Sequence, residues 1–309
     1  MENNWVFKKM KITITGASGF VGRNLQDYLK ETYEIDTLSV RYLPNQFFKI
    51  DTYAIVHLAG KAHDLKKVSK PIDYYEANFE LTKQLFDAFL NSETEVFIFL
   101  SSVKATADKV KGVLMEDNNS SPETHYGISK FKAEQYILSK QLPQGKRVYI
   151  IRPCMIHGQG NKGNLNLLYS LVSKGLPWPL GVFTNQRSFL SVDNLCFVIK
   201  EILENKSIQA GVYNVADDEA ISTNDLILIL SQALDKKCTI LKIPTPFIIG
   251  FSRLGDFLSL PLNSERLEKL TENYVISNKK ILKAMGKPLP VSAHEGLLKT
   301  FKSFGNNKK

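Results

Sequence analysis

Short runs of β-branched and aromatic residues alternate along the chain with longer segments in which apolar positions recur every three to four residues. The short runs predict strands, and the longer segments predict amphipathic helices. The predicted strands cover residues 10–15, 35–40, 54–58, 96–100, 147–151 and 211–215, and the predicted helices cover residues 20–32, 74–91, 126–141, 165–174, 193–205 and 223–234. This alternation predicts an α/β fold, a doubly wound parallel sheet covered by helices on both faces.

Composition and charge narrow the class of protein. The 309 residues are 43% hydrophobic and 23% charged, which is typical of a globular protein with a sizeable core. The net charge of +9 suits nucleic acid, an anionic membrane surface or a phosphate-bearing small ligand. Because the basic residues are dispersed and accompany no known nucleic-acid-binding module, we expect no nucleic-acid partner.

The chain carries no strong signal for insertion into a membrane or for export. Prolines and charges interrupt its most apolar stretch, residues 243–262, so we expect no stable membrane insertion. The first ten residues do not resemble a signal peptide. Three scattered cysteines predict reduced thiols, no metal site and a cytoplasmic location.

A glycine-rich segment, TGASGFVG at residues 15–22, lies between the first predicted strand and the first predicted helix. Glycines there permit a tight turn and close approach of a pyrophosphate to backbone N–H groups, and the helix N-terminus attracts phosphate. An ordinary tight turn is the alternative, but the flanking strand and helix favour a dinucleotide site. The residues expected to bind the cofactor here are Gly16, Ser18, Gly19, Phe20, Val21 and Gly22.

Two Tyr-x-x-x-Lys pairs occur, Tyr126–Lys130 and Tyr136–Lys140, and chance alone supplies roughly one such pair in a chain of this composition. The first pair opens a predicted helix within SPETHYGISKFKAE, residues 121–134. The second pair lies further along that helix and is turned away from the face of the first, as expected of surface residues.

With its GxxGxxG spacing and its YGISK segment, the chain resembles the extended short-chain dehydrogenase/reductase family. The resemblance implies a Rossmann fold and the catalytic residues Ser102, Tyr126 and Lys130. Ser102 is preferred to Ser101 by alignment of the end of strand 96–100. In the reactions of this family a tyrosine moves a proton while hydride is transferred. The charge of Lys130 is expected to lower the pKa of Tyr126 from about 10. Ser102 is expected to hydrogen-bond the reacting oxygen.

The same resemblance extends over almost the whole chain. It implies further cofactor contacts at Leu58, Ala59, Gly60, Asn78, Tyr126, Lys130 and Pro153, and substrate contacts at Ser102, Lys104, Asn164, Leu165, Arg187 and Arg266. A guanidinium such as that of Arg187 suits diphosphate oxygens, although a solvated surface charge is the alternative. Arg266 is the weaker candidate for a phosphate contact.

The resemblance also predicts that two parts of the chain bind different molecules. Residues 1–160 and 191–217 would form the dinucleotide-binding Rossmann domain. Residues 161–190 and 218–309 would form a smaller C-terminal region that binds the sugar nucleotide, because glycines and prolines interrupt long loops after residue 151.

The family includes 4-epimerases, 4,6-dehydratases and 4-keto-sugar reductases. A dehydratase needs an acidic pair just after the catalytic hydroxyl, where this chain has Val103 and Lys104, so dehydration is not expected. The motifs look most like NAD(P)-dependent reductases that act at C4 of UDP-4-keto-6-deoxy-N-acetylhexosamines for surface polysaccharides. A UDP-hexose 4-epimerase, acting on UDP-glucose or UDP-GlcNAc, is the alternative. A non-catalytic NAD(P) sensor is less favoured because the tyrosine and lysine are kept, and a homodimer is possible.

The cofactor edge departs from the family pattern. Only residues 41–53 are available between the second and third strands, so we predict no helix there and a sheet thinned at its adenine edge, with Asp51 a doubtful substitute for the usual acid. Arg41 follows the second predicted strand where NAD-specific proteins place an acid, which favours NADPH over NAD. If Arg41 points to solvent, either cofactor would bind.

Overall fold

A computed structural model describes residues 9–62, 70–161, 165–258 and 262–306. Its central sheet has six parallel strands in the order β2-β1-β3-β4-β6-β9. Their bounds are β1 Lys11–Thr15, β2 Glu34–Leu38, β3 Ala54–His57, β4 Val96–Leu100, β6 Arg147–Pro153 and β9 Gly211–Val215. All six predicted strands therefore form, and the doubly wound α/β fold is confirmed.

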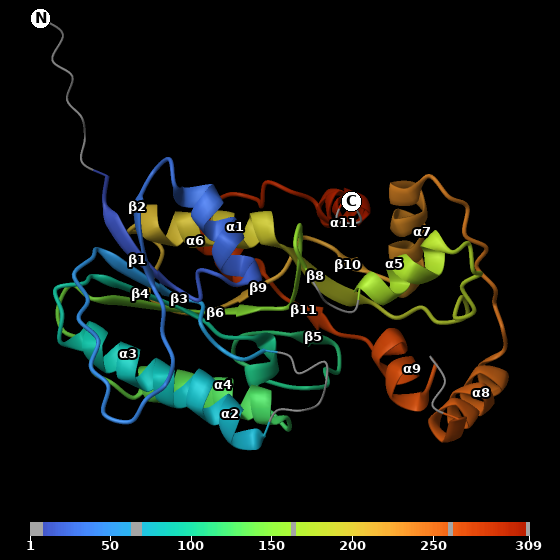
Figure 1. Ribbon diagram of the computed structural model, residues 1–309, viewed down its shortest axis with the longest axis horizontal. Helices are drawn as coiled ribbons and strands as arrows, with labels where there is room; N and C mark the ends of the chain where they lie inside the picture. The colour runs from blue at the N-terminus through green and yellow to red at the C-terminus, as the bar shows by residue number, and fades with distance from the viewer. Residues whose placement is uncertain (1–8, 63–69, 162–164, 259–261, 307–309) are drawn as a thin grey trace, which may run out of the picture.

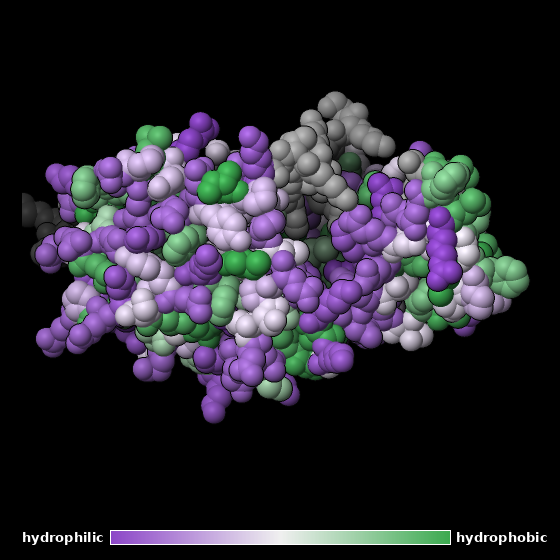
Figure 2. Space-filling view, turned by 90° about the horizontal axis from the view of Figure 1, so that it is seen from below, coloured by the Kyte–Doolittle hydropathy of each residue, from purple (hydrophilic) through white to green (hydrophobic). Residues whose placement is uncertain are grey.

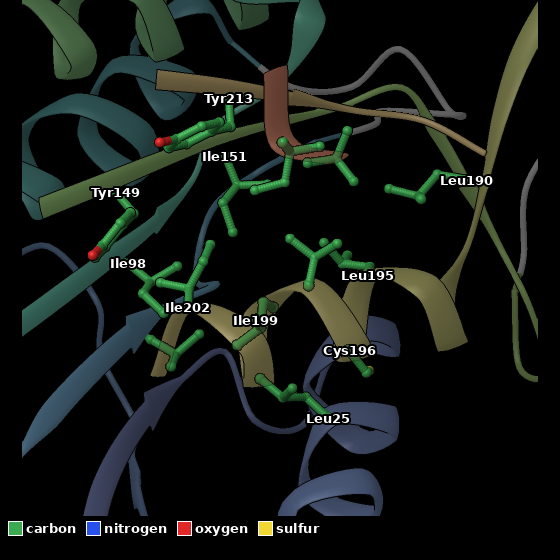
Figure 3. Packing of buried hydrophobic residues seen from close by; sticks show 14 of the residues in the cluster. Leu25, Ile98, Tyr149, Ile151, Leu190, Leu195, Cys196, Ile199, Ile202 and Tyr213 are labelled. Atoms are coloured by element: carbon green, nitrogen blue, oxygen red, sulfur yellow. The ribbon is translucent and has the colours of Figure 1, made fainter. Parts of the chain in front are cut away.

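Helices cover both faces of this sheet (Figure 1). Successive side chains of a strand point to opposite faces, so Val96 and Ile98 of β4 pack with α1 (Phe20–Leu29) and α6 (Val192–Glu204). Phe97 and Phe99 of the same strand pack with α3 (Leu81–Leu90) and α4 (His125–Leu138). Figure 3 shows the first of these cores, in which side chains from α6 meet those of the sheet. The helix α10 (Lys279–Met285) also packs against this core.

The strand β2 forms one edge of the sheet. This is the edge that we predicted to be thin. Residues 41–53 form neither helix nor strand, which confirms the predicted thin edge. Thirteen residues are too few for a strand, a helix and their connections. The strand β2 also ends at Leu38, two residues earlier than expected, so Ser39 rather than Arg41 follows it directly.

A second core lies beyond the carboxyl ends of the strands. It is built from α5 (Leu165–Ser173), α7 (Thr223–Leu234) and α11 (Ala293–Asn306), with side chains from α8 (Thr245–Leu258) and α9 (Ser264–Thr271). The strand β8 (Arg187–Ser191) joins the two parts, because its Phe189 belongs to this core and its Leu190 to the core of the sheet. The division into two domains stays a prediction.

Short strands complete the fold. β8 lies between β7 (Met155–His157) and β10 (Ala220–Ile221), and β11 (Val275–Ile276) pairs with β5 (Val113–Leu114). The sequence did not predict these strands or the helices α8 to α11. α8 forms despite Pro244 and Pro246 because both prolines lie at its start, where a missing N–H has no partner to lose. Among the described residues no helix is both long and apolar enough to cross a membrane.

Candidate active site

The glycine-rich segment forms a tight turn between β1 and α1. Gly16 has a φ of +70°, and an added Cβ would lie 2.7 Å from the backbone nitrogen of Ala59. A Cβ on Gly22 would lie 2.3 Å from the carbonyl oxygen of Gly16, so no side chain fits there without a shift of the backbone. The first turn of α1 contains no acidic side chain. Ser18, Gly19, Phe20 and Val21 therefore lie at a helix N-terminus that suits an anion.

The turn after β3 is held against this segment by buried hydrogen bonds. The ring of His57 is fully buried and lies between two hydroxyls, Thr15 Oγ1 at 2.7 Å and Thr82 Oγ1 at 2.9 Å. Burial lowers the pKa of His57 to about 3, with a further contribution from Lys130, so the ring stays neutral. Leu58 and Ala59 follow directly, and the Ala59 backbone N–H donates to Thr15 Oγ1 at 3.2 Å.

Asn78 fixes the same turn from the opposite side. The single helix expected over residues 74–91 is divided into α2 (Pro71–Tyr75), a π-helical turn (Glu76–Glu80) and α3, and Asn78 lies in the π-helical turn. Its amide accepts from the backbone N–H of Lys61 at 2.8 Å, and it donates to the Lys61 carbonyl at 2.9 Å and to Ser129 Oγ at 3.0 Å. Such π-helical turns are frequent at functional sites.

Gly60 lies close to Asn78 and Lys130, and its lack of a side chain keeps the space between them free. A Cβ at Gly60 would lie 2.7 Å from Asn78 Oδ1 and 3.2 Å from Lys130 Nζ. The glycines at 16, 22 and 60 thus keep side chains out of a continuous stretch of backbone at the carboxyl ends of β1 and β3. This arrangement fits a dinucleotide, with its pyrophosphate at α1.

The two serines after β4 have different surroundings. Ser101 donates a short hydrogen bond to Glu134, which lies in a buried ion pair with Arg152. Ser102 is the N-cap of a short 3₁₀ turn (Val103–Ala105), and its hydroxyl also hydrogen-bonds the phenol of Tyr126. The structure therefore brings Ser102, and not Ser101, to the tyrosine.

Tyr126 lies at the start of α4, where Thr124 caps the helix through a 3.1 Å hydrogen bond from the Gly127 N–H to its hydroxyl. Burial raises the pKa of Tyr126, and the hydrogen bond from Ser102 opposes that rise. The expected lowering by Lys130 is not found. In this structure the serine, rather than the lysine, favours the phenolate.

Lys130 follows one helical turn after Tyr126 and is 4% exposed. Its ammonium donates to the carbonyl oxygen of Leu100 at 2.8 Å and lies 4.6 Å from the centre of the Phe99 ring. Burial lowers the pKa of Lys130 to about 8, and the carboxylate of Glu134 opposes this effect. Its Nζ therefore reaches the carboxyl end of β4, beside Gly60.

The second tyrosine–lysine pair, Tyr136–Lys140, makes contacts that stabilise the packing of two helices. Tyr136 donates a 2.6 Å hydrogen bond to Asp87 of α3, and its ring packs edge to face with that of Phe79. The ammonium of Lys140 lies 4.6 Å from the centre of the Tyr136 ring. This pair joins α3 to α4 away from the glycine-rich segment.

The substrate-side candidates lie partly together. The charge of Arg187 contributes to a lowered pKa of Lys104, and the Lys104 ammonium lies 4.3 Å from the centre of the Tyr274 ring. Arg187 pairs with Glu272 at 3.3 Å and donates to the carbonyl oxygen of Lys269 in α9. Burial lowers the pKa values of both Lys104 and Arg187. Two partly buried cations thus lie where the C-terminal region meets the sheet.

The remaining candidates are more dispersed. Arg41 and Arg266 are exposed, Pro153 is buried at the end of β6, and the side chain of Leu165 lies in the second core. A role for Leu165 would therefore depend on its backbone. Asn164 is outside the described residues.

Sequence reasoning did not identify the buried ion pair between Arg152 and Glu134, with Nη2 and Oε2 2.6 Å apart. Arg152 also donates to the Glu134 carboxylate through Nε at 3.0 and 3.1 Å. Glu134 is one turn beyond Lys130 on α4 and Arg152 is on β6. The signal was available as two charged residues inside an apolar strand and an amphipathic helix, positions that charged side chains seldom occupy unless paired.

Comparison with known proteins places these features in a family. A UDP-glucose 4-epimerase from Vibrio cholerae is 30% identical over 96% of this chain and 97% of its own. An Escherichia coli O157:H7 N-acetyl-alpha-D-glucosaminyl-diphospho-ditrans,octacis-undecaprenol 4-epimerase is 29% identical over 76% of both chains. A Pseudomonas aeruginosa UDP-2-acetamido-2,6-beta-L-arabino-hexul-4-ose reductase is 26% identical over 70% of this chain and 56% of its own.

Among solved structures, a Pseudomonas aeruginosa protein in complex with NADPH superposes with a TM-score of 0.71 at 21% identity, over 97% of this chain and all of that one. That likeness concerns the fold. The model of the NAD dependent epimerase/dehydratase family matches residues 12–216, which include the glycine-rich segment, Ser102, Tyr126 and Lys130. The chain belongs to the NAD dependent epimerase/dehydratase family of enzymes.

Proposed function

We propose that the protein is a 4-epimerase that inverts C4 of a hexose carried on a diphosphate, with UDP-glucose and UDP-GlcNAc as the first substrates to test. The observation that carries the proposal is the hydrogen bond between Ser102 and Tyr126 beside the buried ammonium of Lys130. This arrangement suits removal of a proton from a sugar hydroxyl and its return. The V. cholerae relative, aligned over nearly all of both chains, supports epimerisation.

In this proposal each side chain acts at a stated atom. The phenolic oxygen of Tyr126 accepts the proton of the C4 hydroxyl, and the hydroxyl of Ser102 holds the same sugar oxygen. The hydrogen bond from Ser102 favours the ionised phenol, and Lys130 ties α4 to the end of β4 beside it. Lys104 and Arg187 lie where two cations can meet a diphosphate. A bound NAD or NADP supplies the hydride acceptor and donor.

The residues proposed to hold this cofactor lie where glycines leave the backbone free of side chains. The turn at Gly16 and the start of α1 would hold the pyrophosphate, and the groups around Gly60, Asn78 and Lys130 would hold the nicotinamide end. No acid ends β2, so the usual carboxylate contact to the adenine ribose is missing.

The missing acid favours a second candidate, a reductase of UDP-4-keto-6-deoxy-N-acetylhexosamines. A ribose site without a carboxylate accepts the 2′-phosphate of NADPH, which a net reductase would consume. The sequence motifs placed this reaction first. The P. aeruginosa reductase among the relatives supports it, although it aligns with a smaller share of both chains than the V. cholerae epimerase does.

A direct assay separates the two candidates. Purified protein is incubated with UDP-GlcNAc without added cofactor, and separately with a 4-keto UDP-sugar and NADPH. Epimerisation predicts formation of UDP-GalNAc in the first reaction and little net NADPH oxidation in the second. Stoichiometric NADPH oxidation with no epimer formed would favour the reductase. A polyprenyl-diphosphate-linked GlcNAc, the type of substrate named for the E. coli relative, is a third arm of the same assay.

A further inference from the structure

Asp108 holds the start of α4 from an earlier part of the chain. Its Oδ2 accepts hydrogen bonds from the backbone N–H groups of Glu123 at 2.7 Å and Thr124 at 3.0 Å. Its Oδ1 accepts a third from the Thr124 hydroxyl at 3.2 Å. The first turn of α4 contains no acidic side chain of its own. Because the N-terminus of a helix attracts negative charge, Asp108 supplies a carboxylate that the sequence of α4 lacks.

The segment that carries Asp108 begins at Ser102. The Ser102 hydroxyl accepts a hydrogen bond from the backbone N–H of Lys104 at 3.2 Å. The Lys104 ammonium donates to the backbone carbonyl of Asp108 at 2.7 Å and lies 3.9 Å from its carboxylate. A Cβ on Gly127, in the first turn of α4, would lie 2.4 Å from the carbonyl oxygen of Lys104. The segment therefore packs closely against the start of α4.

The C-terminal region holds the same segment from another side. The phenol of Tyr274 donates a 2.6 Å hydrogen bond to the carbonyl oxygen of Ala107, and its ring contacts the Lys104 ammonium. Tyr274 is buried and forms a β-bridge with Arg187. Figure 2 shows mainly hydrophilic residues between the helices of the sheet and the end of the molecule that carries α8 and α9 in Figure 1. Asp108 is thus fixed by contacts with both parts of the fold.

We propose that Asp108 is a positioning residue, which sets the place of Tyr126 relative to Ser102 by holding the N–H groups just before α4. Tyr126 is two residues beyond Thr124, so a shift at the start of α4 moves its phenol. A displacement of about 1 Å at a reacting group can cost about 10²-fold in rate. The inference rests on the proposed role of Tyr126 and holds for either candidate reaction.

Two substitutions at this position separate positioning from a general loss of stability. Asp108→Ala removes all three hydrogen bonds to the start of α4. Asp108→Asn keeps an oxygen that can accept from both N–H groups, and its amide can donate to the Thr124 hydroxyl. At a temperature where both variants are folded, kcat of Asp108→Ala should fall at least about tenfold. The kcat of Asp108→Asn should stay within about threefold of the unaltered protein, because asparagine also caps helices well.

Ligand binding and hydrogen exchange give readouts that do not depend on the reaction. Asp108→Ala should bind UDP and NAD(H) in calorimetry with affinities within about threefold of normal, because it loses only a partly exposed ion pair with Lys104. Peptides that span residues 122–130 should exchange their amide hydrogens at least about threefold faster in Asp108→Ala. The exchange of Asp108→Asn should match that of the unaltered protein.

The matched control is Asp218→Ala, because Asp218 accepts a 3.1 Å hydrogen bond from the backbone N–H of Ala293 at the start of α11. It should leave both kcat and the exchange of residues 122–130 unchanged. The proposal is overturned if folded Asp108→Ala keeps its kcat or its slow exchange, or if Asp108→Asn is equally impaired. An unaltered protein inactive in both reactions would contradict the proposed function, and the exchange measurement would still confirm or overturn the hold of Asp108 on α4.

Discussion

The ammonium of Lys130 lies 2.8 Å from the carbonyl oxygen of Leu100, so the helix that carries the tyrosine is tied to the end of the strand that carries the serine. Because Lys130 is on α4 and Leu100 ends β4, this hydrogen bond joins the two elements at the site. The hydrogen bond also gives the buried ammonium of Lys130 a polar partner. The relative positions of Ser102, Tyr126 and Lys130 therefore depend on the packing of α4 on the sheet.

Replacement of the catalytic candidate Tyr126 should remove the reaction without removing the fold. Tyr126→Phe keeps the ring but has no group to move a proton, so kcat should fall by about 10²–10⁴. Tyr136→Phe is the matched control, since it loses only a hydrogen bond to Asp87 and about 1 kcal/mol of stability. Steady-state kinetics of both variants check the prediction. Normal kinetics in Tyr126→Phe would show that the tyrosine is not the proton acceptor.

The lowered pKa of Lys130 predicts how stability changes with pH. With a folded pKa of about 8 against about 10.5 in the unfolded chain, the unfolded state binds more protons between these values. The free energy of unfolding should therefore rise with pH in this window, by at most about 1.4 kcal/mol per pH unit from this group. In Lys130→Met this contribution should be missing. Denaturant titrations at pH 7.5, 8.5 and 9.5 compare the two slopes, and equal slopes would contradict the assignment.

The ion pair behind the site should matter for stability and for Lys130 together. Glu134→Gln leaves Arg152 buried beside a neutral group and should cost ~3 kcal/mol or more of unfolding free energy. It also removes the carboxylate that raises the pKa of Lys130, so that pKa should fall further. Ser101→Ala is the milder comparison, because it keeps the ion pair and loses one hydrogen bond. Chemical denaturation measures the difference, and a cost no larger than that of Ser101→Ala would argue against the pair.

A single methyl group added at Gly60 should weaken cofactor binding. Gly60→Ala places a Cβ against Asn78 and Lys130, so NAD(H) and NADP(H) should bind more weakly by at least about tenfold. Gly305→Ala, whose Cβ would meet only the Tyr169 hydroxyl at an ordinary 3.6 Å, should bind both cofactors normally. Isothermal titration gives the affinities. Unchanged binding by Gly60→Ala would place the cofactor elsewhere.

The choice between cofactors depends on the end of β2. Arg41→Ala should weaken NADP(H) binding more than NAD(H) binding if its guanidinium reaches the 2′-phosphate. The side chain is exposed and three residues beyond Leu38, at the edge where the sheet is thin. Titration of both cofactors against the variant measures the preference. Equal affinities, unchanged in the variant, would show that the site accepts either cofactor.

Sequence patterns predicted the parts of the fold that are periodic and local. The strand β4 has alternate residues buried on two faces, and the glycine-rich segment needs a turn that only glycine forms, so both were visible in the sequence. Prolines and charges excluded residues 243–262 as a membrane-spanning segment, and the shorter helix α8 within this stretch was not predicted. The hydrogen bonds of Asn78 and the pairing of Arg152 with Glu134 join distant segments, and no periodic signal records such contacts.

Isotope retention at C4 tests the central claim, hydride transfer at C4 of a diphosphate-linked hexose, most directly. UDP-GlcNAc that carries deuterium at C4 is incubated with the protein in ordinary water, and the epimer is analysed by NMR. The account predicts UDP-GalNAc with the deuterium kept at C4, and no product with Tyr126→Phe. An epimer with hydrogen from solvent at C4, or no change at C4 in the unaltered protein holding its cofactor, would contradict it.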